Sequence, residues 1–224
     1  MRARRLVVGV LAVAGVVQLL QGGWIEAKAW LARGLIEQAW QALLADGAPA
    51  RPWPWADTWP VARLTVPAHG VERLVLHGAS GRTLAFGPAW DSASAPPGGS
   101  GLVLFSGHRD THFRFLADLR PGDELRLAHP GGEVRYRVEG AEVFDTRNSR
   151  LVDHDGSDRL LLVTCYPFAS LVPGGPLRYA VSARAVVDDG VPGRGAPSVL
   201  RAGVRTDAAA AVAAAPAGAH RSGG

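Results

Sequence analysis

One cysteine, one histidine and one arginine stand at the ends of strand-like segments, and together they could carry out covalent catalysis. Cys165, the only cysteine of the chain, ends the apolar run Leu160–Thr164. His108 follows a second apolar run at residues 102–105, and Arg178 opens a third strand-like segment. A thiolate can attack a carbonyl, an imidazole can move the proton, and a guanidinium can stabilise the oxyanion. The pattern therefore predicts a site built from a cysteine nucleophile.

The chemistry depends on the ionisation of the thiol. An unperturbed cysteine, with a pKa near 8.5, is only a few per cent thiolate at pH 7. An adjacent imidazole raises that fraction or accepts the proton, and later protonates a leaving amine. Thr164 could bind the substrate through its hydroxyl or position the end of the strand, and we expect His112 to line or cap the site. Each residue also has a structural alternative: a core cysteine, a surface histidine or a solvated arginine.

Composition excludes several classes of function. The 224 residues suffice for one domain with a full core plus appendages. The net charge of +4 is spread along the chain without interleaved aromatic residues, which argues against binding to nucleic acid. A single cysteine excludes an internal disulfide and a cysteine-pair metal site, and there is no HExxH pattern. We predict neither a metal nor another cofactor.

The N-terminus carries a segment that could cross a membrane. Residues 1–5 include three arginines, and residues 6–25 are almost entirely apolar, enough for a helix of about 30 Å. The segment is either an uncleaved anchor or a signal peptide cleaved at Ala27-Lys28-Ala29. We favour the anchor, since that cleavage site lies far beyond the apolar stretch and contains a lysine. The basic start places the N-terminus in the cytoplasm and the rest across the membrane.

The whole chain divides by composition into four segments. After the anchor at residues 1–25, residues 26–60 form an amphipathic helix and a Trp/Pro-rich linker. Residues 61–187 alternate in short runs broken by turn residues, which predicts an all-β catalytic barrel, closed or nearly so. Residues 188–224 are an Ala/Gly/Pro-rich tail that we expect to be disordered.

Eight strands and one or two helical turns are predicted within the barrel segment. We expect the helical turns at residues 111–119, with the apolar side chains turned inward. The predicted strands are Val61–Val66, Val71–Leu76, Leu102–Phe105, Glu124–Ala128, Glu133–Val138, Ala141–Asp145, Arg159–Thr164 and Leu177–Val187. The strands are expected to pair mainly antiparallel, with parallel pairs left open.

These motifs together resemble those of one enzyme family, the sortases. Gly107-His108-Arg109 resembles the histidine region of sortases, and Leu161-Leu162-Val163-Thr164-Cys165 resembles their TLxTC signature with leucine in place of the first threonine. Leu177-Arg178-Tyr179 fits the arginine that opens their last strand. Trp53–Pro60 and Thr164–Phe168 are similar to the Gram-negative class, class GN.

The resemblance implies an eight-stranded sortase-type barrel with short helices, and a cysteine transpeptidase. Such an enzyme cleaves an LPxTG-like sorting signal of a substrate protein between threonine and glycine, and then transfers the thioester-bound product to an amine acceptor. The roles implied are nucleophile for Cys165, general acid or base for His108, and oxyanion or backbone donor for Arg178. The implied location is the inner membrane, crossed once, with the catalytic domain facing the periplasm.

Three alternatives compete with this interpretation. A thiol endopeptidase would use water as the acceptor. A periplasmic binding module would keep the barrel without catalysis. A membrane-tethered adaptor would use its tryptophans for contacts and would not depend on Cys165.

Overall fold

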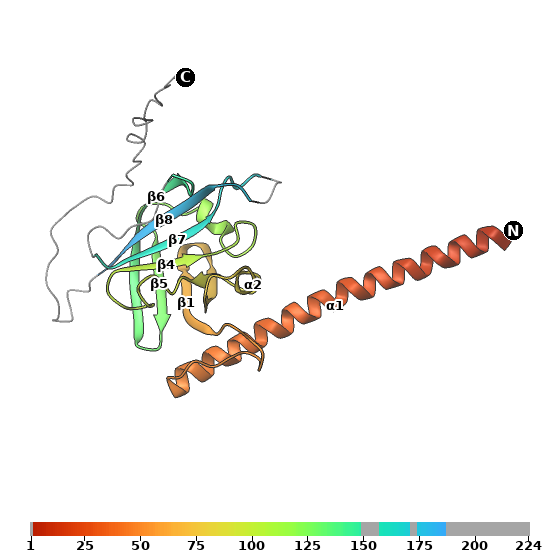
Figure 1. The fold of residues 1–224 in the computed structure, drawn as a ribbon, viewed down its shortest axis with the longest axis horizontal. Helices are drawn as coiled ribbons and strands as arrows, with labels where there is room; N and C mark the ends of the chain where they lie inside the picture. Colours follow the sequence, from red (N-terminus) through yellow and green to blue (C-terminus); the bar gives the residue numbers. More distant parts are fainter. Residues whose placement is uncertain (1, 149–156, 171–173, 187–224) are drawn as a thin grey trace, which may run out of the picture.

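Eight strands close into a barrel in the order β1-β2-β3-β4-β7-β8-β6-β5 (Figure 1). The computed structural model describes residues 2–148, 157–170 and 174–186. Among the described strand pairs, β2–β3 and β4–β7 are parallel and the others are antiparallel. The predicted eight-stranded β-barrel, preceded by an apolar helix, is confirmed.

The elements follow one another along the chain as a long helix and then strands with short helical turns between them. They are α1 (Arg2–Asp46), β1 (Pro60–Val66), the 3-10 helix η1 (Pro67–His69), β2 (Val71–His77), α2 (Gly81–Leu84), β3 (Ala89–Trp90), β4 (Leu102–Ser106), the 3-10 helix η2 (Arg114–Ala117), β5 (Glu124–His129), β6 (Gly132–Asp145), β7 (Arg159–Cys165) and β8 (Leu177–Ala185).

Two details of the strand prediction are wrong, although the number of strands is right. The segments 133–138 and 141–145 belong to one strand, β6, because the register shift between Val138 and Gly140 bends the strand without ending it. Strand β3 was not predicted, since two residues are too few to show an alternating pattern. The predicted helical turn is present as η2, and its flanking apolar residues Phe113 and Leu119 are buried as expected.

Alternation along β7 gives the strand two apolar faces. Leu160 and Leu162 point into the barrel core, whereas Leu161 and Val163 belong to a second buried cluster on the outer side of the wall. The outer cluster also includes Phe144 from β6 and Ala180 from β8. Being apolar on both faces is typical of a central strand in a covered sheet, and it explains the unbroken hydrophobic run before Cys165.

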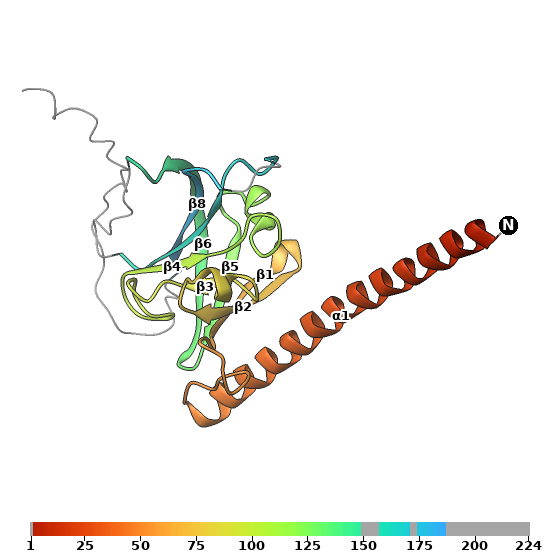
Figure 2. The ribbon, with the colours of Figure 1, turned by 45° about the vertical axis from the view of Figure 1, so that its right-hand side comes forward.

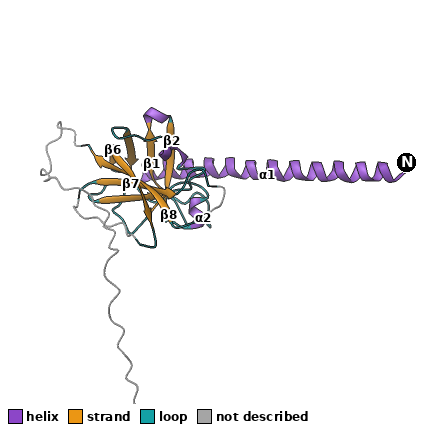
Figure 3. Ribbon diagram, turned by 90° about the horizontal axis from the view of Figure 1, so that it is seen from above, coloured by secondary structure: helices purple, strands orange, loops and turns teal. Residues whose placement is uncertain are grey.

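Helix α1 runs without a break through the predicted boundary at residue 25 and extends well beyond the barrel (Figures 1 and 2). Only its C-terminal turns pack on the barrel, through Ile36, Ala39, Trp40 and Leu43 at helical spacing. Arg63 of β1 adds polar contacts there, lying 5.7 Å from the Trp40 ring centroid and donating to the Glu37 carboxylate. Seen from above, α1 leaves the barrel on one side (Figure 3).

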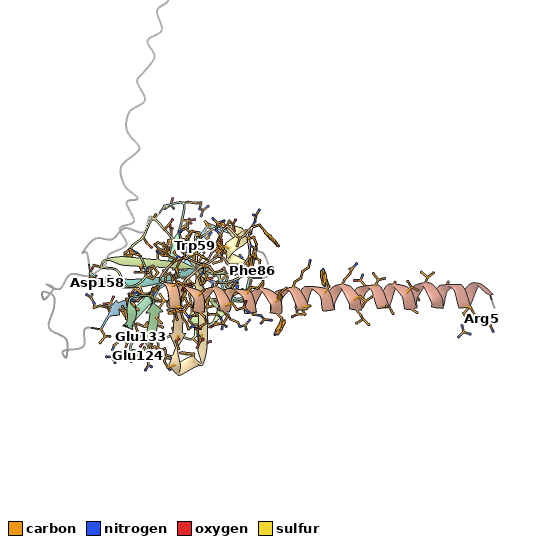
Figure 4. The ribbon with its side chains drawn as sticks, turned by 90° about the horizontal axis from the view of Figure 1, so that it is seen from below. Arg5, Trp59, Phe86, Glu124, Glu133 and Asp158 are labelled. Carbon is orange, nitrogen blue, oxygen red and sulfur yellow. The ribbon has the colours of Figure 1, made fainter. Side chains whose placement is uncertain are left out.

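The Trp/Pro-rich linker packs on the barrel through two of its three tryptophans. Trp59 stacks on His77 of β2 with ring centroids 4.0 Å apart, and Trp53 meets Phe86 edge-on at 5.2 Å. Trp55 is 81% exposed. Figure 4 shows Trp59 and Phe86 at the barrel and Arg5 at the distant end of α1. The predicted tail at residues 188–224 lies outside the described residues.

Candidate active site

Cys165 and Arg178 are direct partners across β7 and β8. The antiparallel register pairs Cys165 with Arg178 at the last residue of β7. Directly paired residues project from the same face of a sheet, with Cβ atoms about 4.5–5.5 Å apart. That face is the outer one, because Cys165 continues the alternation of Val163, and Arg178 that of Ala180. Cys165 is half-buried, so the sulfur is not sealed inside the barrel.

His108 stands at the end of the neighbouring strand on the other side of β7. The parallel register pairs Ser106 of β4 with Val163, and the Gly107 N–H continues the ladder by donating to the Val163 carbonyl at 3.1 Å. His108 follows Gly107 directly, two residues beyond the end of β4, beside the end of β7 that carries Cys165. Cys165 and Arg178 are therefore paired on β7 and β8, and His108 follows the end of β4, the other neighbour of β7 in the barrel.

The Thr164 side chain links the end of β7 to the segment after β4, one residue before Cys165 and one residue before His108. Its hydroxyl is buried and donates to the Gly107 carbonyl at 2.7 Å. The side chain points to the barrel interior, away from the face that carries Cys165, because successive strand residues face opposite ways. Of the two roles considered for Thr164, this geometry corresponds to positioning the strand end.

Replacing Thr164 with valine is expected to lower the free energy of unfolding by about 1–3 kcal/mol, because the Gly107 carbonyl loses its buried donor while the side-chain volume is kept. Urea denaturation followed by tryptophan fluorescence measures the loss. Thr65→Val, the same change at a half-buried position on β1, is the matched control. Equal stability of the two variants would contradict the importance of this hydrogen bond.

Gly107 allows the chain before His108 to lie against the core. A Cβ at this position would stand 2.7 Å from the nearest atoms of the Phe113 ring, which is too close for any side chain. Phe113 is itself buried, and its N–H donates to the His108 carbonyl at 3.0 Å. The loop that carries His108 is thus closed by one hydrogen bond and packed by one aromatic ring.

Arg178 turns part of its guanidinium toward its own loop. Its Nη1 donates to the carbonyl oxygens of Gly175 at 2.8 Å and Leu177 at 2.9 Å. The residues beside the pair are aromatic: Tyr179 stacks with Tyr166 at 6.2 Å and meets Phe168 edge-on at 5.1 Å. Aromatic packing therefore supports both the chain after Cys165 and the chain after Arg178.

His112 is half-buried near His108. Burial lowers the pKa of His112, a hydrogen bond to the Ala85 backbone opposes this, and the positive charges of Arg73 and His108 lower the pKa further. His112 thus contacts the residue that follows α2, and its role in lining or capping the site stays a prediction. Within residues 2–148, 157–170 and 174–186, no group of three or more histidine, cysteine or acidic side chains could hold a metal ion.

A model of the sortase domain matches residues 64–186, which is more than half of the chain and includes the three residues at the strand ends. This chain belongs to the sortase family. Sortase D of Bacillus subtilis is 33% identical to this sortase over 125 residues, a match that covers 55% of the chain and 62% of that relative. The chain thus accounts for less than two thirds of the length of this relative.

Solved structures agree on the fold of this sortase. Sortase A from Corynebacterium diphtheriae is 26% identical, with a TM-score of 0.53, over 62% of this chain and 66% of that one. A pilus-related sortase C of Group B Streptococcus is 22% identical, with a TM-score of 0.52, over 58% and 69%.

One residue of this region was missed by sequence reasoning. Arg109 is buried and contacts Pro167 and Ser170, beyond the end of β7. Only its position directly after His108 could have indicated a role for Arg109 at the site, because its hydrogen-bond partners are 58 and 61 residues away along the chain.

Proposed function

We propose that this sortase is a membrane-anchored cysteine transpeptidase of the Gram-negative class. It cleaves an LPxTG-like sorting signal and transfers the product to an amine acceptor. The observation that carries the proposal is the pairing of Cys165 with Arg178 across β7 and β8, with His108 just beyond the end of the neighbouring strand β4, within the matched sortase domain. Sortase family membership supports the reaction class.

In the first half of the reaction, the Cys165 thiolate attacks the threonine carbonyl carbon of the signal. Arg178 has three N–H groups on Nε and Nη2 besides the two on Nη1, and these donate to the oxyanion of the tetrahedral intermediate. The C–N bond then breaks, and His108 gives its proton to the leaving glycine amine. The product is a thioester between Cys165 and the threonine of the substrate.

In the second half, an amine acceptor replaces the departed peptide. Its nitrogen attacks the thioester carbonyl, and His108 accepts the proton that the amine loses. The C–S bond breaks, a new amide forms, and Cys165 leaves as a thiolate. One amide is exchanged for another, so the cycle needs no cofactor, oxidant or external energy source.

Helix α1 supports the proposed anchoring. Its segment Gly9–Asp46 is long and apolar enough to contain a membrane-crossing stretch, and the most apolar window is not buried in the protein. Trp24 and Trp30 are 63% and 73% exposed, and tryptophan favours the interface between membrane and water. Arginines 2, 4 and 5 would hold the N-terminus in the cytoplasm of a cell with an inner membrane, so that the barrel faces the periplasm.

A ligation assay tests the proposal and separates it from the endopeptidase alternative. The full chain in detergent micelles is incubated with labelled LPxTG-type peptides, with and without triglycine, and the products are identified by mass spectrometry. We expect a ligated product whose yield rises with the concentration of triglycine. Hydrolysed peptide alone at every acceptor concentration would identify an endopeptidase, and no cleavage of any signal peptide would favour the binding module.

A further inference from the structure

Arg109 is a buried arginine that joins the two loops of the site. Its side chain is only 7% exposed, although it follows His108 directly. The guanidinium Nη1 donates to the Pro167 carbonyl at 2.6 Å, and Nη2 donates to the Ser170 carbonyl at 2.8 Å. Both acceptors lie in the segment that follows Cys165. The Arg109 side chain thus links the segment that follows His108 to the segment that follows Cys165.

Asp110 compensates the charge of this buried guanidinium. The Arg109 Nε donates to one carboxylate oxygen at 2.9 Å, and Nη2 donates to the other at 3.1 Å. The planar, forked group is therefore held on one edge by Asp110 while it reaches two carbonyls beyond Cys165. Lysine has a single nitrogen on a flexible stem and cannot reproduce bonds in these separate directions.

The arginine completes a pair of connections around His108 and Cys165. Thr164 joins the two chains one residue before the pair, by its bond to Gly107. Arg109 joins them just after the pair, by its bond to Pro167. His108 and Cys165 are therefore each flanked in the sequence by residues that bond to the other segment. These bonds limit movement of the imidazole relative to the sulfur.

The electrostatics agree with this geometry. The pKa of Arg109 is raised, chiefly by its hydrogen bond to Asp110, against an opposing effect of burial, and the negative charge of Cys165 adds to the increase. The guanidinium is therefore near enough to interact with a thiolate at Cys165.

We propose that Arg109 is a positioning residue of this sortase, which holds the Pro167–Ser170 segment against the His108 loop and so sets the geometry between thiol and imidazole. The inference rests on the proposed transpeptidase function, because the value of that geometry lies in proton transfer between the two groups. A misplacement of about 1 Å in such a site can cost on the order of 10²-fold in rate.

The test compares Arg109→Gln, Arg109→Lys and Asp110→Asn in the full chain. Arg114→Gln is the matched control, since Arg114 is exposed on η2 and the change in charge is the same. For Arg109→Gln we expect kcat for peptide cleavage to fall about 10²-fold while KM changes less than about threefold. Arg109→Lys should fail to restore kcat, and Asp110→Asn, which keeps both carbonyl contacts, should lose less than Arg109→Gln.

Alkylation of Cys165 by iodoacetamide gives a readout that needs no peptide substrate. Because the thiol and the imidazole would lose their fixed relative placement, we expect the alkylation profile (rate against pH) of Arg109→Gln to differ from that of the unchanged chain, and that of Arg114→Gln to match it. If Arg109→Gln does not fold, as judged by circular dichroism, Arg109→Lys and Asp110→Asn decide the matter by the same two measurements. Unchanged kcat and alkylation profiles in the folded Arg109 variants would overturn the inference.

Failure of the inference can be distinguished from failure of the proposed function. If Arg109 variants behave like the control while Cys165→Ala is inactive and the unchanged chain forms the ligated product, the proposed transpeptidase function stands and Arg109 has no positioning role. If Cys165→Ala still cleaves the signal, the proposed function itself is wrong, whatever the Arg109 variants do.

Discussion

Cys165→Ala is expected to abolish the thioester and with it all cleavage of the sorting signal. Without sulfur at this position no acyl-enzyme can form, so the rate should fall on the order of 10⁴-fold or more. The barrel should persist, because Cys165 is half-buried at the end of β7 and contributes little to the core. Mass spectrometry of the intact chain after mixing with peptide measures the adduct directly.

The single cysteine makes this experiment unusually direct. A thioester or alkyl adduct on a chain with one thiol needs no peptide mapping to locate it. Cys165→Ser serves as a second variant, since it keeps the size of the side chain but supplies a poor nucleophile at pH 7. Continued cleavage by the alanine variant would show that the reaction does not pass through Cys165.

Arg178→Lys is expected to reduce the rate of thioester formation by about 10²–10³-fold, the usual cost of losing one oxyanion donor. Lysine keeps the positive charge opposite Cys165 but loses the fork that can bond the loop carbonyls and an oxyanion together. Stopped-flow measurement of acylation, using a peptide that releases a fluorophore on cleavage, resolves this step from the transfer to the amine.

Arg184→Lys is the matched control for that prediction. Arg184 lies on the same strand, β8, where it pairs with Glu139 at 2.7 Å, well away from Cys165. An exposed ion pair of this kind contributes little to stability, and we expect acylation within about twofold of the unchanged protein. Equal acylation rates for Arg178→Lys and Arg184→Lys would contradict the role of Arg178 as an oxyanion donor.

The local parts of this structure could be predicted from the sequence, and the long-range parts could not. The alternation that defines β1 and the apolar run of β7 are visible in consecutive residues, and so is the position of Cys165 at a strand end. The pairing of Cys165 with Arg178 depends on register, which no single strand reveals. The resemblance to sortases, carried by several short motifs, supplied the grouping of the three residues.

The errors have physical causes of the same kind. A bulge between Val138 and Gly140 keeps β6 continuous where turn-like residues suggested a break. Strand β3 is only two residues long and is defined by its neighbours β2 and β4. Arg109 looked like a loop residue, and only the folded chain brings the carbonyls of Pro167 and Ser170 to its guanidinium.

The unbroken course of α1 has a mechanical consequence for the proposed anchoring. If residues 6–25 fill the bilayer, the stretch from residue 25 to the first buried contact at Ile36 rises about 1.5 Å per residue, or roughly 16 Å. A continuous helix of this length is a rigid spacer, so it would hold the catalytic barrel at a fixed, short distance from the membrane surface. Substrate proteins tethered to the same membrane could present their cleavage site at that distance from the membrane. Soluble substrates would reach the active site only by free diffusion.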